Sequence, residues 1–189
     1  MDIVLSEDQA FRPHDPSTQA SLLSVLLGVQ AVVQVVSMAV PGLRYLVALL
    51  FLCTLPVLFV WLHRVRLNSD VPGRTHRWSA RWAIGMWFVP GLNLWAPYQL
   101  LADIAAAGAP TASRDEVTRP VLAWWLSWLV GLVATLLSVR LWWFSRNVWE
   151  PPLPAWVGAV FFALASVLLI VVVHRLSALH PADERLYRG

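Results

Sequence analysis

The chain has 189 residues, of which 58% are hydrophobic and 13% are charged, and its mean hydropathy is +0.62. So little polar surface excludes a water-soluble globular domain, and the composition therefore predicts an integral membrane protein. The 14 basic residues are all arginines and outnumber the 11 acids. They border apolar runs, where arginine sets membrane orientation and meets anionic lipid, so nucleic acid is not an expected partner.

Four long apolar runs follow a polar, net-acidic tail at residues 1–19. A helix needs about 20 apolar residues to cross a hydrocarbon core of about 30 Å. The runs that meet this length are 20–40, 43–62, 121–139 and 155–173. Because lipid cannot hydrogen-bond a free backbone group, each run is expected to be a helix. The sequence predicts an all-α, polytopic helical membrane domain over residues 20–174, with a polar C-terminal tail at 175–189.

Small residues recur at helical spacing in three of these runs, and such stripes let helix backbones approach closely in a membrane. The stripes are Ser24, Gly28 and Ala31; Ser127, Gly131 and Thr135; and Ala155, Ala159 and Ala163. The second stripe is the clearest, because bulky residues flank it. The first run also carries Gln30, Gln34 and Ser37 on one face, where they are expected to hydrogen-bond across the bundle.

The stretch from Trp87 to Tyr98, W-F-V-P-G-L-N-L-W-A-P-Y, interrupts a further apolar segment at 78–101. Inside a helix, Pro90 and Pro97 would each remove a hydrogen bond and disfavour helix in the preceding residue, so a break at Pro90-Gly91 is expected. Irregular backbone at membrane depth must be buried in protein or line a wet cavity. We therefore predict that Asn93 is a polar clasp, held by backbone groups or by Gln30 and Gln34.

The arginines indicate both orientation and the number of crossings. The loop 63–81 carries five arginines against one acid and is expected to be cytoplasmic. If segment 78–101 dips in and returns, or lies along the interface, the arginines divide into eleven inside and three outside; a full span gives eight and six. The prediction is four transmembrane helices plus a proline-broken re-entrant or interfacial segment. Five transmembrane helices stay open as the alternative.

Tryptophans gather near the ends of the runs, where indole rings prefer the level of the lipid headgroups. They are therefore expected to be interfacial anchors: Trp61, Trp78, Trp124, Trp125, Trp142, Trp143 and Trp156. His63, with Arg64 and Arg66, is similarly expected to anchor beside the headgroups.

Three blocks of the chain resemble the signature of a known family. They are Arg66-x-Asn68; the block from Trp82 to Tyr98, which holds Gly85, Trp87, Pro90, Asn93, Trp95 and Pro97; and the pair Trp124-Trp125. The resemblance, over residues 43–174, is to a bacterial membrane family catalogued as domain of unknown function 4328. It implies a small multi-pass membrane protein and supplies no catalytic residues.

Motifs for chemistry are absent from the sequence: there is no H-E-x-x-H, G-x-S-x-G, Walker loop or C-x-x-C, and Cys53 is the only cysteine. We therefore expect no enzyme, cofactor or metal. The favoured function is a non-enzymatic binding, assembly or regulatory component of the cell membrane, in contact with the lipid bilayer and with a membrane-protein partner or a homo-oligomer. The alternative is a small channel or carrier whose polar path is lined by the broken segment from Trp82 to Tyr98.

Overall fold

The computed structural model describes residues 16–40, 42–69, 77–79, 82–110, 113–145 and 152–179, and all regular secondary structure in these ranges is helical. Most of the two predicted polar tails, at 1–15 and 180–189, lies outside the described residues. So does much of the basic loop, at 70–76 and 80–81.

Four helices of the described chain are long and apolar enough to cross a membrane: α1 (Ser17–Val36), α2 (Leu43–Asn68), α5 (Arg114–Ser145) and α6 (Leu153–Leu179). The predicted helical membrane bundle with four spans is therefore confirmed. Three of the helices run several residues past the predicted spans, because a helix continues through the polar residues at which an apolar window stops. The helical domain consequently begins at Ser17 and ends at Leu179, slightly beyond the predicted 20–174.

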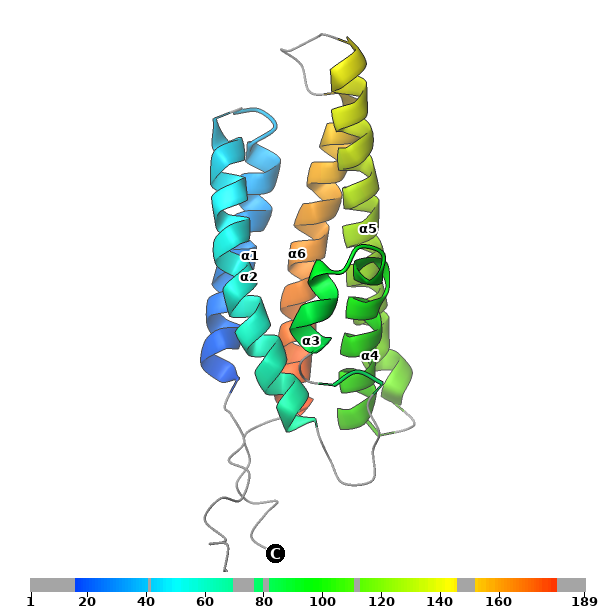
Figure 1. Cartoon of the computed structure of the whole chain (residues 1–189). Coiled ribbons are helices and arrows are strands. Elements are labelled where there is room, and N and C mark those ends of the chain that lie inside the picture. The colour runs from blue at the N-terminus through cyan, green and yellow to red at the C-terminus, as the bar shows by residue number, and fades with distance from the viewer. Residues whose placement is uncertain are drawn as a thin grey trace, which may run out of the picture.

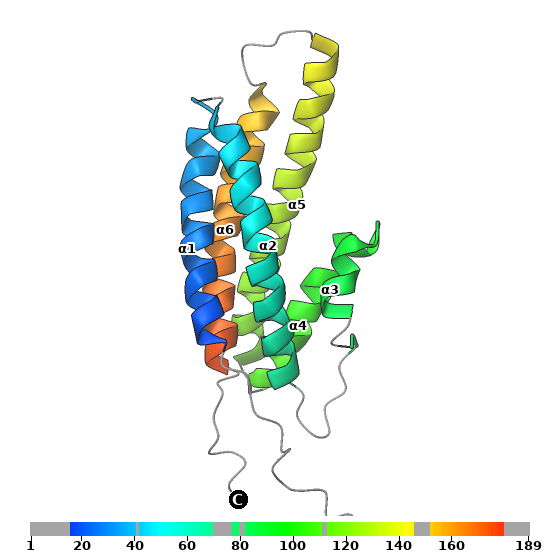
Figure 2. The ribbon, with the colours of Figure 1, turned by 60° about the vertical axis from the view of Figure 1, so that its left-hand side comes forward.

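The four long helices form two antiparallel pairs, α1 with α2 and α5 with α6, and α6 also packs along α1 (Figure 1). The helices α1 and α6 therefore lie together on one side of the bundle. On the other side, the short helices α3 and α4 lie beside α2 and α5 in one half of the bundle (Figure 2). This half contains the start of α1 and the end of α6.

Segment 78–101 does not supply a fifth crossing helix. The described chain there consists of α3 (Trp82–Gly85), the 3₁₀ turns η2 (Met86–Phe88) and η3 (Leu92–Leu94), and α4 (Ala96–Gly108). We call residues 82–108 the hairpin and residues 88–95 the hairpin tip. The 13 residues of α4 span only about 20 Å at 1.5 Å each, which is too short for the hydrocarbon core. The hairpin rises to about the middle of the bundle and returns (Figure 1).

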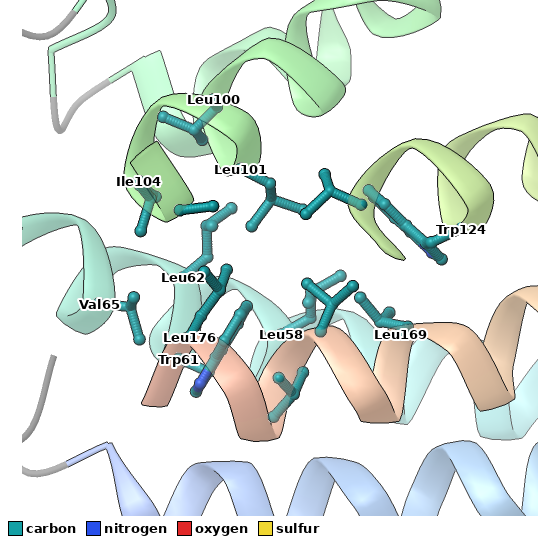
Figure 3. Packing of buried hydrophobic residues seen from close by; sticks show 14 of the residues in the cluster. Leu58, Trp61, Leu62, Val65, Leu100, Leu101, Ile104, Trp124, Leu169 and Leu176 are labelled. Carbon is teal, nitrogen blue, oxygen red and sulfur yellow. The ribbon is translucent and has the colours of Figure 1, made fainter. Parts of the chain in front are cut away.

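The buried core lies where the hairpin meets the long helices. Leu100, Leu101 and Ile104 of α4 belong to the same buried cluster as Trp61 and Leu62 of α2 (Figure 3). The same cluster contains Trp124 of α5, Leu169 and Leu176 of α6, and Leu23 of α1. The core is thus concentrated in the half of the bundle that contains the hairpin.

Two members of the stripe of Ser127, Gly131 and Thr135 lie against α6, so the α5 helix packs through this stripe at Gly131 and Thr135. A Cβ atom on Gly158 would lie 2.7 Å from Thr135 Oγ1 and 3.3 Å from the carbonyl oxygen of Gly131. A Cβ atom on Gly131 would lie 3.0 Å from the ring of Phe162. The two helices can approach this closely only because both positions are glycine.

The stripe on α1 is different, because a Cβ atom on Gly28 would meet nothing within 4 Å. Gly28 is therefore not a point of close helix contact. Spacing alone does not distinguish Gly28 from Gly131, since both lie in apolar runs among other small residues.

Several tryptophans expected at the headgroup level are instead part of the core. Trp61 is fully buried and donates from Nε1 to Ser177 Oγ at 3.0 Å, and Trp124 and Trp125 are each only 3% exposed. The prediction of interfacial anchors is wrong for these three, because they pack inside the bundle: Trp61 bonds to α6, and Trp125 bonds to Leu94 of the hairpin. Trp143, at 74% exposed, faces outward as an anchor would.

Candidate functional site

The hairpin turns at Pro90 and Gly91, where the sequence predicts a break. Val89 is extended (φ −92°, ψ 114°), as expected for a residue before proline, and Gly91 has a φ of +88° that favours glycine. The backbone N–H of Asn93 donates to the backbone carbonyl of Val89 at 3.2 Å and closes the turn. Pro97 differs from the expectation, because it lies in the first turn of α4, where a missing N–H removes no helical hydrogen bond.

On the side of α2, Arg66 holds the chain that leads into the hairpin. Its guanidinium donates from Nε at 3.2 Å and from Nη2 at 2.9 Å to the carbonyl oxygen of Trp78. Arg66 is only 4% exposed, so the expected headgroup anchor is wrong for this residue. Its neighbour Arg64 instead donates to Gln19 Oε1 of α1 at 3.0 Å.

On the side of α5, Trp125 holds the hairpin tip. Its Nε1 donates to the carbonyl oxygen of Leu94 at 3.1 Å. The ring of Trp125 stacks on Trp128 at a centroid distance of 5.0 Å and meets Trp87 edge-on at 6.5 Å. On its other side, Trp87 lies 6.0 Å from the ring of Phe59 on α2. The three sequence blocks that carried the family resemblance thus meet around the hairpin.

The buried polar atoms that lack a partner also belong to this region. Within the described residues, the buried side-chain nitrogen and oxygen atoms without a hydrogen bond are Trp78 Nε1, Trp87 Nε1, Asn93 Oδ1 and His63 Nδ1. The first of these residues leads into the hairpin, the next two are in it, and His63 lies on the end of α2 that bears Arg66. Because buried polar groups in proteins are nearly always paired, each of these exceptions calls for an explanation, such as a binding role or a bound water molecule.

The prediction that Asn93 is held by Gln30 and Gln34 is wrong. Gln30 Oε1 lies 3.3 Å from Thr54 Oγ1, which donates to it from α2. The helix α1, which carries Gln30 and Gln34, is on the opposite side of the bundle from α3 and α4 (Figure 2). Asn93 Oδ1 itself accepts no hydrogen bond from the described residues. The order of helices in a bundle, which decides such a contact, is not encoded in the spacing of the residues.

Several predicted residues of the block line the outer side of the hairpin. Trp82 is 44% exposed and Trp95 is 46% exposed. At the tip, Phe88 is 71% exposed and Leu94 is 49% exposed. The remaining members are placed as follows: Gly85 is in α3 near the Trp82 ring, Tyr98 is half-buried against the core, and Asn68 ends α2. Phe59 and Trp128 could not be identified from the sequence, since nothing separates them from other aromatic residues in apolar runs.

No group of three or more His, Cys, Asp or Glu side chains that could hold a metal ion occurs among the residues with described structure. Cys53 is a free, exposed cysteine on α2.

Residues 26–179 match the model of a protein family described as Domain of unknown function (DUF4328). The chain belongs to this family. The match covers most of α1, all of α2, α5 and α6, and the whole hairpin, so the DUF4328 unit is wider than the predicted 43–174. No curated protein and no solved structure matches the chain.

Proposed function

We propose that this chain is a non-enzymatic component of a bacterial cell membrane that binds a membrane-protein partner through the hairpin tip. The observation that carries the proposal is the exposed, irregular backbone of the hairpin tip. Pro90 and Gly91 are exposed, and the chain around them is not helical. Lipid-exposed irregular backbone does not occur in the hydrocarbon region, so protein or water must cover this turn.

The depth of the tip follows from its contact with α5. Trp125, which holds Leu94, lies six residues beyond Arg119 along α5. At 1.5 Å per residue this separation is about 9 Å. If Arg119 marks the headgroup level, the tip lies inside the hydrocarbon of the same leaflet.

The side chains at the tip favour protein rather than water as the cover. Phe88, Leu94 and Trp95 are large and apolar, and each is at least 46% exposed. A membrane helix packed on them would shield the turn from lipid. The alternative of a small channel or carrier, in which water covers the turn, would need polar side chains here.

The orientation is part of the proposal. The arginine-rich loop 63–81 lies on the cytoplasmic side, and so do both termini and the chain between α4 and α5. The division of arginines between the two faces supports this orientation. So does the arrangement of the bundle, since α1 begins, α2 ends and α6 ends on the face from which the hairpin rises (Figure 1).

A photo-crosslinking amino acid at position 88 tests the partner. In native membranes we expect Phe88 and Trp95 probes to form adducts with the same protein, either another membrane protein or a second copy of the chain. A matched probe at Val133, which is 63% exposed on α5 and away from the tip, should react mainly with lipid. Equal protein adducts from all three positions, or none from positions 88 and 95, would contradict the proposal. Solute flux through liposomes that contain only this chain would instead favour the channel.

A further inference from the structure

Two buried atoms of the hairpin have opposite hydrogen-bonding needs. Trp87 Nε1 is a donor and Asn93 Oδ1 is an acceptor, and neither has a partner among the described residues. The two residues lie in η2 and η3, which pack against each other on either side of the Pro90-Gly91 turn. The hairpin thus carries an unpaired donor and an unpaired acceptor a few residues apart.

The chemistry of these atoms limits what can pair with both. An ester, a phosphate or a carboxylate offers only acceptors, and an ammonium group offers only donors. A hydroxyl group accepts from the indole N–H and donates to the amide oxygen through one atom. We propose that Trp87 and Asn93 together bind a hydroxyl group, supplied by a neutral long-chain alcohol such as a diacylglycerol.

The surroundings favour a neutral, lipid-borne hydroxyl. A charged headgroup is costly at this depth, whereas an uncharged alcohol is not. A buried water molecule has the same hydrogen-bonding chemistry, so the experiment must separate the two sources.

The purified chain, with ¹⁵N-labelled tryptophan, is placed in nanodiscs of dioleoylphosphatidylcholine and dioleoylphosphatidylglycerol, and Trp87→Phe identifies the Trp87 indole signal. Adding dioleoylglycerol should move that signal to lower field as its hydrogen bond forms. Dioleoylglycerol with an acetylated hydroxyl should bind more weakly, because it cannot donate to Asn93. Asn93→Leu should weaken binding of the alcohol by about tenfold, equivalent to 1.4 kcal/mol, and should leave the acetylated analogue unaffected.

Two controls make the result decisive. The other indole signals of Asn93→Leu show whether the variant is folded, and Trp143→Phe, far from the tip on α5, should bind the alcohol as the parent does. If dioleoylglycerol changes nothing and the Trp87 N–H exchanges magnetisation with water, water supplies the hydroxyl and the lipid site is overturned. If the Trp87 signal neither moves with dioleoylglycerol nor exchanges with water, Trp87 and Asn93 do not share a hydroxyl group and the proposal is wrong. The measurement needs no protein partner, so its failure leaves the proposed function to be decided by crosslinking.

Discussion

Gly158→Leu is expected to push α6 away from α5 and to lower the free energy of unfolding by about 1–3 kcal/mol, the usual cost of overpacking. The nearest atoms to a new Cβ would be Thr135 Oγ1 at 2.7 Å and the Gly131 carbonyl oxygen at 3.3 Å. Neither can move freely, because one belongs to a β-branched side chain and the other to helix backbone. Thermal unfolding in detergent measures the effect. An unchanged melting temperature would mean that the two helices are not packed through Gly158.

Two further variants separate this contact from a general effect of losing a glycine. Gly158→Ala should be partly rescued by Thr135→Ala, because the second change removes the atom closest to the new methyl group. Gly28→Ala is the matched control in α1, where a Cβ meets nothing within 4 Å. It should stabilise the protein by about 0.5–1 kcal/mol, the usual gain of alanine over glycine inside a helix.

Arg66→Met is expected to release the hairpin from α2. The variant keeps most of the length of the side chain but removes both donors to the Trp78 carbonyl. A hydrogen bond to a charged group contributes about 1.5–3 kcal/mol, so a loss of this size is expected. Hydrogen exchange of residues 82–98 should accelerate more than that of α6, because the bond fixes the chain that leads into the hairpin.

Arg66→Lys and Arg64→Gln are the controls for this prediction. Lysine keeps the charge but cannot donate from two adjacent nitrogens of a planar group, so it should restore only part of the protection. Arg64 is half-buried and donates from Nη1 to Gln19 of α1. Its replacement should leave exchange of residues 82–98 unchanged. Equal acceleration in Arg64→Gln and Arg66→Met would show that the bond to Trp78 does not hold the hairpin.

Features set by local chemistry could be predicted from the sequence. The length of the apolar runs gives the four spans, and Pro90 with Gly91 gives the break, since proline and glycine act on their own backbone. The arginine counts further favour a returning segment over a fifth span. The site residues Arg66, Trp87 and Asn93 could be selected because they stand in the family block.

Features set by tertiary packing could not be predicted. Arg66 and Trp125 resemble ordinary interfacial residues in the sequence, and they are buried only because the hairpin returns over them. Asn93 and Gln30 are both polar residues at membrane depth, yet their helices lie on opposite sides of the bundle. No periodicity along one helix carries information about which helix lies beside it.

The four-span architecture depends most on the returning path of the hairpin, and side-specific cysteine labelling tests this path directly. Ser79 precedes the hairpin and Ser113 follows it, and Cys53→Ala gives a background without other cysteines. In intact cells, an impermeant maleimide should fail to label Ser79→Cys and Ser113→Cys, and both should react once the membrane is opened. Labelling of Ser113→Cys but not of Ser79→Cys from outside intact cells would show that the segment crosses the membrane, and would contradict the four-span account.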